Sequence, residues 1–151
     1  MNHWPRRREG EERSAPKRMA AAKVLAQAIK QVHTGPTTHV LAMGDFNDTE
    51  LSPTLLLLTD PAQGGQWRNA LSAIPPAERY SYNFGGVSEL IDGILLSPAL
   101  ADEVSAATIL HVDTDYPVGL RLDTSPGGLA WRTSDHDPAL VIVGRAPATP
   151  A

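Results

Sequence analysis

The sequence predicts an α/β protein. A helical pattern over residues 16–32 is followed by a short continuous apolar run at 38–43. A helix followed by such a run is typical of α/β architectures, in which the run forms a strand covered on both faces. Two later apolar runs, at 90–96 and 139–143, indicate further buried strands. The length of 151 residues fits one domain, which we place at residues 1–145.

The first elements have clear local signals. Ala21, Leu25, Ala28 and Val32 recur at steps of three and four, which is the spacing of one helix face. The Thr-Gly-Pro sequence at 34–36 is a helix stop. The Ser-Pro pair at 52–53 predicts the start of a second helix, with serine as the cap and proline in the first turn.

The later elements follow from alternation and from glycine or proline breaks. Tyr80, Tyr82 and Phe84 alternate with polar residues, which predicts a strand, and we expect these rings to serve the core rather than to stack on a substrate. The full expected order is a strand stub at 2–4, a loop at 5–15, the helix at 16–32, strand 38–43, helix 53–58, a connection at 59–79, strands 80–84 and 90–96, helix 98–104, strand 107–112, a loop at 113–133, strand 139–143 and a disordered tail at 146–151.

Composition and charge exclude several classes of protein. There is no cysteine, so disulfides, thiolate metal sites and cysteine nucleophiles are excluded. No stretch of about 18 apolar residues could span a membrane, and the Arg-rich start lacks the apolar segment of a signal peptide. The cellular compartment stays open. Residues 1–30 carry a charge of +5 and the remainder −9. Such an asymmetry fits an anionic substrate with a metal cation, or simply a solvated basic loop.

Acidic and amide side chains gather at three of the expected strands. Asp45 and Asn47 follow the first apolar run, Asp92 interrupts the second, and the sequence SDHDP at 134–138 precedes the last. A charged group within a strand is costly unless it is paired or binds a metal, and ligands of open α/β sheets gather at strand ends. We therefore expect one shared site.

The residue types of this site suit the hydrolysis of a phosphate ester. Carboxylate and amide oxygens bind hard cations such as Mg²⁺. A neighbouring carboxylate such as Asp135 favours the charged form of His136. A metal and an imidazolium would together offset the charge of the phosphoryl group, while an Asp positions the attacking water.

Four motifs occur here in the order in which they occur in a known family: NHWPRR at 2–7, GDFND at 44–48, LIDGILLSP at 90–98 and SDHDP at 134–138. On these motifs the chain resembles the endonuclease/exonuclease/phosphatase superfamily, whose members are deoxyribonuclease-like. The resemblance spans nearly the whole chain. It implies the C-terminal half of a four-layer α/β/β/α sandwich.

The resemblance implies a role for each matching residue. Asp45 would orient or activate water, Asn47 would contact the scissile phosphate, and His136 would bind the phosphoryl oxygens. His3 would stabilise the transition state or assist the leaving group. The remaining assignments are Asp92 as the family's central-strand acid, Asp135 as a partner of His136 or a metal ligand, Arg7 as a phosphate contact, and Asp45, Asn47 and Asp135 as ligands of Mg²⁺ or Mn²⁺.

The resemblance also implies that part of the site lies elsewhere. In the family, an Asn and a metal-binding Glu come from the first half of the sandwich, whereas Glu9, Glu11 and Glu12 follow the His motif here. We therefore expect little activity from this chain alone, and either pairing with a missing half or self-association through an exposed sheet face. Nucleic acid, inositol phosphate, sugar phosphate and lipid headgroup all stay open as substrates.

Other interpretations remain for individual motifs. DFNDTEL and SDHDP can be capped turns, Asp92 can lie at an exposed edge, and Arg6, Arg7 and Arg8 can be a solvated loop. A calcium loop starting at Asp45 is excluded, because Glu50 and Leu56 stand where Gly and Glu are required. Ser134 has no nucleophile-elbow context. His33, His39 and His111 are expected to be structural or exposed. A silent remnant that binds or oligomerises is the alternative to an enzyme.

Overall fold

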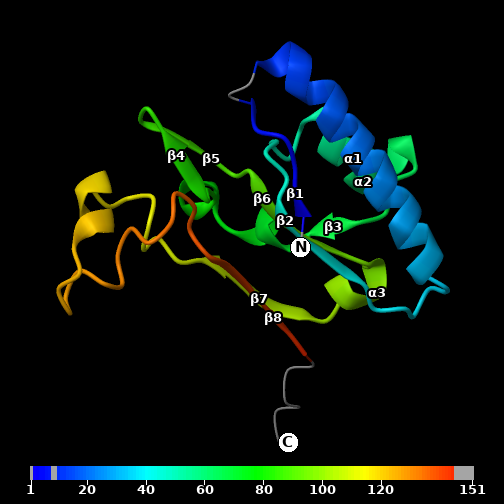
Figure 1. The fold of residues 1–151 in the computed structure, drawn as a ribbon. Coiled ribbons are helices and arrows are strands. Elements are labelled where there is room, and N and C mark those ends of the chain that lie inside the picture. Colours follow the sequence, from blue (N-terminus) through cyan, green and yellow to red (C-terminus); the bar gives the residue numbers. More distant parts are fainter. Residues whose placement is uncertain (1, 8–9, 145–151) are drawn as a thin grey trace, which may run out of the picture.

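A computed structural model describes residues 2–7 and 10–144, and every structural statement below concerns these residues (Figure 1). Arg8 and the tail at 146–151 lie outside them. The helices are α1 (Glu11–Val32), α2 (Pro53–Thr59) and α3 (Pro98–Ala101). The strands are β1 (Asn2–His3), β2 (Leu41–Asp45), β3 (Arg68–Asn69), β4 (Tyr82–Phe84), β5 (Val87–Glu89), β6 (Asp92–Leu96), β7 (Val104–Ile109) and β8 (Ala139–Val143). Short 3₁₀ helices are η2 (Pro61–Gln63), η3 (Ala70–Ala73), η4 (Pro76–Glu78) and η5 (Val118–Leu122).

The main sheet has the strand order β1-β2-β6-β3. Strand β1 runs parallel to β2, and β6 runs antiparallel to both β2 and β3. The hairpins β4–β5 and β7–β8 form separate two-stranded sheets. The observed mixture of helices and sheets confirms the predicted α/β class.

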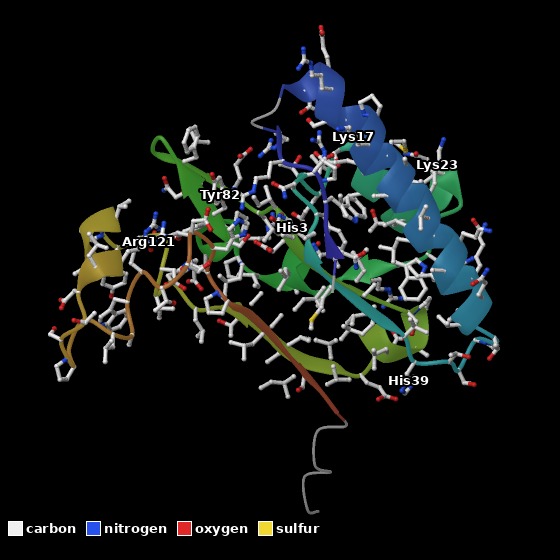
Figure 2. The ribbon with its side chains drawn as sticks, viewed as in Figure 1. His3, Lys17, Lys23, His39, Tyr82 and Arg121 are labelled. Carbon is white, nitrogen blue, oxygen red and sulfur yellow. The ribbon has the colours of Figure 1, made fainter. Side chains whose placement is uncertain are left out.

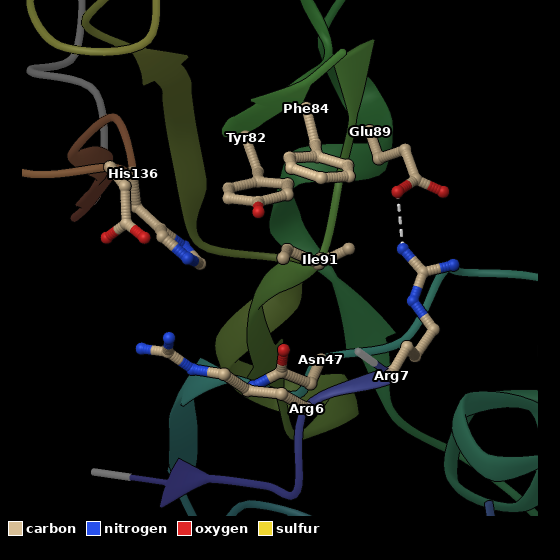
Figure 3. A pocket seen from close by; sticks show the side chains of 9 residues that line it. Arg6, Arg7, Asn47, Tyr82, Phe84, Glu89, Ile91 and His136 are labelled. Carbon is tan, nitrogen blue, oxygen red and sulfur yellow. Dashed lines mark hydrogen bonds and ion pairs between the residues drawn. The ribbon is translucent and has the colours of Figure 1, made fainter. Parts of the chain in front are cut away.

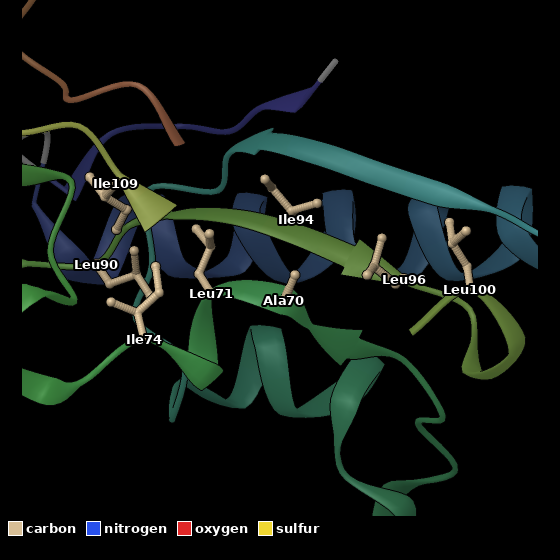
Figure 4. Close-up of a cluster of buried hydrophobic side chains, with 8 residues drawn as sticks. All are labelled: Ala70, Leu71, Ile74, Leu90, Ile94, Leu96, Leu100 and Ile109. Atoms are coloured by element: carbon tan, nitrogen blue, oxygen red, sulfur yellow. The ribbon is translucent and has the colours of Figure 1, made fainter. Parts of the chain in front are cut away.

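Alternate residues of β6 face two different cores, because successive side chains of a strand point to opposite faces. Leu95 packs with Trp4 and Phe46 beneath α1 and α2. Ile94 and Leu96 pack with η3 and with the inner residues of β7 and β8 (Figure 4). The central strand is therefore buried on both sides, as its apolar sequence predicts, and this fixes the strand that carries Asp92.

Strands β2 and β8 differ from the prediction that both are covered on two faces. Leu41 and Met43 of β2 are 41% and 46% exposed, and Leu140 and Ile142 of β8 are 45% and 62% exposed. Each strand alternates between covered and open positions. An apolar run alone does not reveal that only one of its faces is packed, so this prediction was wrong.

The helix α1 begins five residues before the predicted start. Two acidic residues, Glu11 and Glu12, occupy its first turn, where the helix dipole favours negative charge. Pro16 lies inside the helix rather than at its start. The third helix is shorter than predicted, and β7 begins at Val104, before the expected residue 107. Among the described residues, no helix is long and apolar enough to cross a membrane.

Gly44 allows the first strand to lie against the second. Its φ is +148°, and a Cβ at this position would fall 2.0 Å from the backbone oxygen of Asn2. Only a residue without a side chain fits such an approach. The parallel pairing of β1 with β2 then places His3 directly beside Asp45. The glycine of the GDFND motif thus positions the first histidine of the expected site.

Candidate active site

Three neighbouring strands bring predicted site residues into one row. Asp45 ends β2, Asp92 begins the antiparallel β6, and the two residues are register partners. His3 of β1 is the register partner of Asp45 on the other side. His3 and Tyr82 lie in the middle of the molecule, whereas Arg121 and His39 lie at opposite ends of it (Figure 2). The sheet register alone therefore gathers one histidine and two carboxylates.

The loop before β8 adds His136 to this row. An isolated antiparallel β-bridge between Tyr82 and His136 fixes this loop to the β4 strand. His136 Nδ1 lies 2.6 Å from Asp92 Oδ2, and Nε2 lies 3.8 Å from Asp45 Oδ2. Ser81 Oγ, fully buried, donates to the same Asp92 oxygen at 2.6 Å. Since an ionised carboxylate only accepts hydrogen bonds, Nδ1 carries the proton in this pair.

Asn47 fixes the orientation of Asp45. Its backbone N–H donates to Asp45 Oδ1 at 2.7 Å, and its Nδ2 donates to Asp45 Oδ2 and to the Trp4 carbonyl, each at 2.8 Å. Asn47 adopts a left-handed conformation with φ of 50°, which asparagine tolerates better than most residues. Its side-chain oxygen points into the adjacent pocket (Figure 3).

The electrostatics of the site favour a charged histidine beside a crowded carboxyl group. Burial raises the pKa of Asp45, and the nearby Asp92 raises it further, although Asn47, His136 and His3 pull it down. Burial alone would lower the pKa of His136, but the hydrogen bond and charge of Asp92, together with Asp45 and Asp135, outweigh burial and raise that pKa. The imidazolium is therefore favoured, and it faces the group that would act on water.

A divalent cation fits this set of donors when the imidazole of His136 is neutral, because an imidazolium has no free lone pair for a metal. Asp45, Asp92 and His136 each offer one ligand atom, and these atoms all lie within 4.8 Å of one another. Carboxylate oxygens suit Mg²⁺ and Mn²⁺, whereas an imidazole ligand suits softer ions such as Zn²⁺. The set overlaps the sequence-predicted ligands Asp45, Asn47 and Asp135 only at Asp45. The predicted ligand set stays a prediction.

A pocket of about 260 Å³ opens beside His136 (Figure 3). Arg6, Arg7 and Asp135 line it, together with Asn47. Arg7 forms an ion pair with Glu89, another lining residue. The structure pairs His136 with Asp92 instead of Asp135, and the exposed Asp135 contributes its charge to the pocket. Arg7 and Asp135, which the sequence predicted for the site, therefore lie in the same pocket as His136.

Tyr82 and Phe84 also line this pocket, which sequence reasoning missed. Phe84 is 57% exposed, so the expectation that it is a core residue was wrong.

The three other histidines lie outside the site. His33 packs edge-on against Trp67, His39 lies 3.4 Å from Glu103, and His111 bonds Asp137.

Two supporting carboxylates were also missed. The buried Asp48 accepts a hydrogen bond at 2.9 Å from Arg18 of α1, whose side chain is fully buried. The buried Asp137, next to His136, accepts from the backbone N–H groups of Asp113 and Thr114 and from His111. Burial raises, but these hydrogen bonds lower, the pKa of Asp137, and the net direction is downward. Each of these carboxylates anchors one of the loops that carry the site residues. The sequence signal for them was their position within the GDFND and SDHDP motifs.

Comparison with known proteins identifies the family. A sequence profile of the Endonuclease/Exonuclease/phosphatase family matches residues 1–115. A solved structure of a mannosyl-6-phosphatase from Bacteroides thetaiotaomicron is similar in fold, with a TM-score of 0.56 and 19% identity over 85% of this chain. The similarity covers 46% of that protein, so this chain spans less than half of its length. No curated protein matches the chain. The chain therefore belongs to the Endonuclease/Exonuclease/phosphatase family.

Proposed function

We propose that this chain carries part of the active site of a divalent-metal-dependent phosphoester hydrolase. The observation that supports the proposal most strongly is the convergence of Asp45, Asp92 and His136, whose ligand atoms lie within 4.8 Å of one another. Asn47 supports it further, because both oxygens of Asp45 are held by its donors. The family membership and the phosphatase of similar fold agree with the same class of reaction.

The residues suggest a simple division of labour. Asp45 accepts the proton of a water whose oxygen forms a new bond to phosphorus, while the ester bond to the leaving oxygen breaks. Because the pKa of Asp45 is raised, it lies closer to neutral pH, and Asp45 is therefore a better proton acceptor. His136, held by Asp92, donates to a phosphoryl oxygen and offsets its charge. His3, whose side chain is 61% exposed and lies 3.6 Å from Asp45, would assist the leaving oxygen.

A metal ion would be held through the carboxylate of Asp45, with Asn47 and Asp135 as further donors, so that the charged His136 still donates to the phosphate. When bound, Mg²⁺ or Mn²⁺ supplies positive charge to the phosphate and orients it. The family resemblance favours a phosphodiester over a monoester, and nucleic acid, inositol phosphate, sugar phosphate and lipid headgroup all stay open as substrates. We also propose that full activity requires either a further segment that completes the sandwich or a second copy of the chain.

The test is hydrolysis of bis-p-nitrophenyl phosphate and p-nitrophenyl phosphate by the purified chain. We expect slow turnover with Mg²⁺ or Mn²⁺ that EDTA abolishes and that His136→Ala lowers by about 10²–10³. His39→Ala, at an exposed histidine far from the site, is the matched control and should leave the rate unchanged. Fast turnover would contradict the requirement for a further segment. Turnover that survives EDTA, or that is equal in His136→Ala, would contradict the proposed site.

One observation favours a second candidate function, a binding or oligomerising module without catalysis. The open apolar positions of β2 and β8 are the kind of surface that another protein surface covers. A chain that associates but neither binds phosphate nor turns over any ester would support this alternative.

A further inference from the structure

The pocket beside His136 has an aromatic wall. Tyr82 and Phe84 lie two residues apart on β4, so both side chains project from the same face of the hairpin. Their rings lie side by side above the pocket (Figure 3). The Tyr82 ring is 5.0 Å from the His136 ring, at an interplanar angle of 44°. The wall therefore begins at the reacting centre and extends away from it.

Polar groups face this wall across the pocket. Arg6 and Asn47 lie opposite the two rings, and the Arg7–Glu89 ion pair closes the far end (Figure 3). The Arg7 and Glu89 side chains are 32% and 27% exposed, so both are partly withdrawn from water. Glu89 is the register partner of Tyr82, which fixes it next to the aromatic wall.

The size and lining of the pocket favour a single ring that carries hydroxyl groups. A volume of about 260 Å³ lies just below the range of about 300–1,000 Å³ that holds drug-sized ligands. Aromatic faces contact the apolar C–H face of such a ring, and a carboxylate with a guanidinium makes charge-assisted hydrogen bonds to its hydroxyls. The phosphate of the same molecule would then reach His136.

We propose that this pocket binds the sugar ring of a monosaccharide phosphate, with Tyr82 and Phe84 as its platform and Arg7–Glu89 as its hydroxyl-binding pair. The proposal rests on the proposed function, because it assigns the alcohol part of the ester that this site would cleave. It makes Tyr82, Phe84 and Glu89 specificity-determining residues.

The charges argue against a polynucleotide in the same place. Glu89 and Asp135 both line the pocket, and Glu89 already pairs with Arg7. Beyond residue 30 the chain carries a net charge of −9. Nucleic-acid affinity depends on neutralising several phosphates with Lys and Arg, and in this pocket Glu89 and Asp135 offset the charges of Arg6 and Arg7. A ligand with one phosphate and a neutral ring avoids that repulsion.

The test measures binding instead of turnover. Glucose 6-phosphate, inorganic phosphate and thymidine 5′-monophosphate are titrated into the purified chain by calorimetry, with chemical shifts followed by NMR. We expect glucose 6-phosphate to bind about tenfold or more tighter than inorganic phosphate and than the nucleotide. Tyr82→Leu and Phe84→Leu should each weaken the sugar ester by about 2- to 12-fold and leave inorganic phosphate unchanged.

Two further variants separate the pocket from the hairpin. Asn83→Ala alters the opposite face of β4, where Asn83 bonds Ser88, and should leave all three affinities unchanged. Glu89→Gln keeps the shape and should weaken the sugar ester by about tenfold or more, because the charge-assisted hydrogen bonds to its hydroxyls are lost.

The possible outcomes distinguish this proposal from the proposed function. Equal binding of the sugar ester and inorganic phosphate, no measurable binding of the sugar ester, tighter binding of the nucleotide, or an equal effect of Phe84→Leu on inorganic phosphate would each overturn the proposal. Hydrolysis of p-nitrophenyl esters with no effect of these variants on sugar-ester binding would retain the function and reject the pocket. Selective sugar-ester binding without any hydrolysis would retain the sugar-binding pocket and reject the proposed hydrolase function.

Discussion

Asp45 is the residue on which the site converges. Its two oxygens accept from Asn47, and two imidazoles lie 3.6 and 3.8 Å from Oδ2. The histidines reach it from β1 and from the loop before β8. Because each neighbour belongs to a different element, the carboxylate is held from several directions. Such a fixed carboxylate can present one defined geometry to a water or a cation.

Asp92 is expected to set the protonation of His136. Burial lowers the pKa of His136 and Asp92 is the strongest of the groups that raise it, so Asp92→Asn should lower that pKa from its wild-type value. The imidazole C–H signals are titrated by NMR in EDTA. Asp135→Asn, which removes a charge but no hydrogen bond to the ring, is the matched control and should shift the pKa less.

The same shift affects stability. Because the pKa of His136 is raised in the folded chain, the charged imidazole contributes stability below the unfolded pKa, and this contribution is lost as pH rises through the folded pKa. The wild-type chain should therefore lose stability relative to Asp92→Asn as the pH rises above about 6.5. An unchanged pKa of His136 in Asp92→Asn would contradict the assigned pairing.

Helix α1 supports the site through a buried cation. Arg18 has a fully buried side chain that donates to Asp48 at 2.9 Å, to Ser14 Oγ at 2.9 Å and to Glu11 at 2.6 Å. Asp48 directly follows Asn47 in the loop after β2. The helix therefore holds the loop that carries the Asp45–Asn47 pair.

Replacing this cation should be costly. Arg18→Met leaves Asp48 buried without its partner, and breaking a buried ion pair on one side costs about 3–5 kcal/mol. Lys17→Met makes the same change at an exposed neighbour on α1 and should alter the free energy of unfolding by no more than about 0.5 kcal/mol. Urea denaturation monitored by tryptophan fluorescence measures both. Equal stability of the two variants would show that Arg18 does not anchor the loop.

Local patterns predicted most elements, while tertiary contacts decided the details. The helix body, the buried β6 and the position of β8 follow from apolar spacing. The early start of α1 depends on Glu11, whose carboxylate reaches Arg18 seven residues later, and a propensity argument cannot see that contact. For the site, the motifs predicted which residues meet. They could not predict that His136 turns toward Asp92, because the strand register brings a residue 44 positions away closer than its sequence neighbour.

The whole molecule leaves large apolar side chains open on two strands. The exposed faces of β2 and β8 carry four of them: Leu41, Met43, Leu140 and Ile142. Exposed apolar strands promote association with other strands or surfaces. The expected self-association or pairing with a further segment therefore stays a prediction with a definite physical basis.

We expect the chain to associate increasingly with concentration, because association removes these side chains from water. The double variant Met43→Lys with Ile142→Lys should stay monomeric at concentrations where the wild-type chain associates. Leu51→Lys, at a residue 83% exposed outside the sheets, is the control and should behave like the wild-type chain. Sedimentation velocity measures all three. A wild-type chain that remains monomeric would contradict the prediction.

Because Asn2 passes so close to Gly44, a side chain added at position 44 would change the position of His3. A methyl group at position 44 would displace the first strand and carry His3 away, although no atom of the imidazole is altered. The hydrogen bonds between Asn47 and Asp45, and the pairing of Asp45 with Asp92 across the two strands, would remain. Gly44→Ala would also move the Trp4 carbonyl that accepts from Asn47, so comparison with His3→Ala would tell whether this imidazole acts through its ring or only through the docking of its strand.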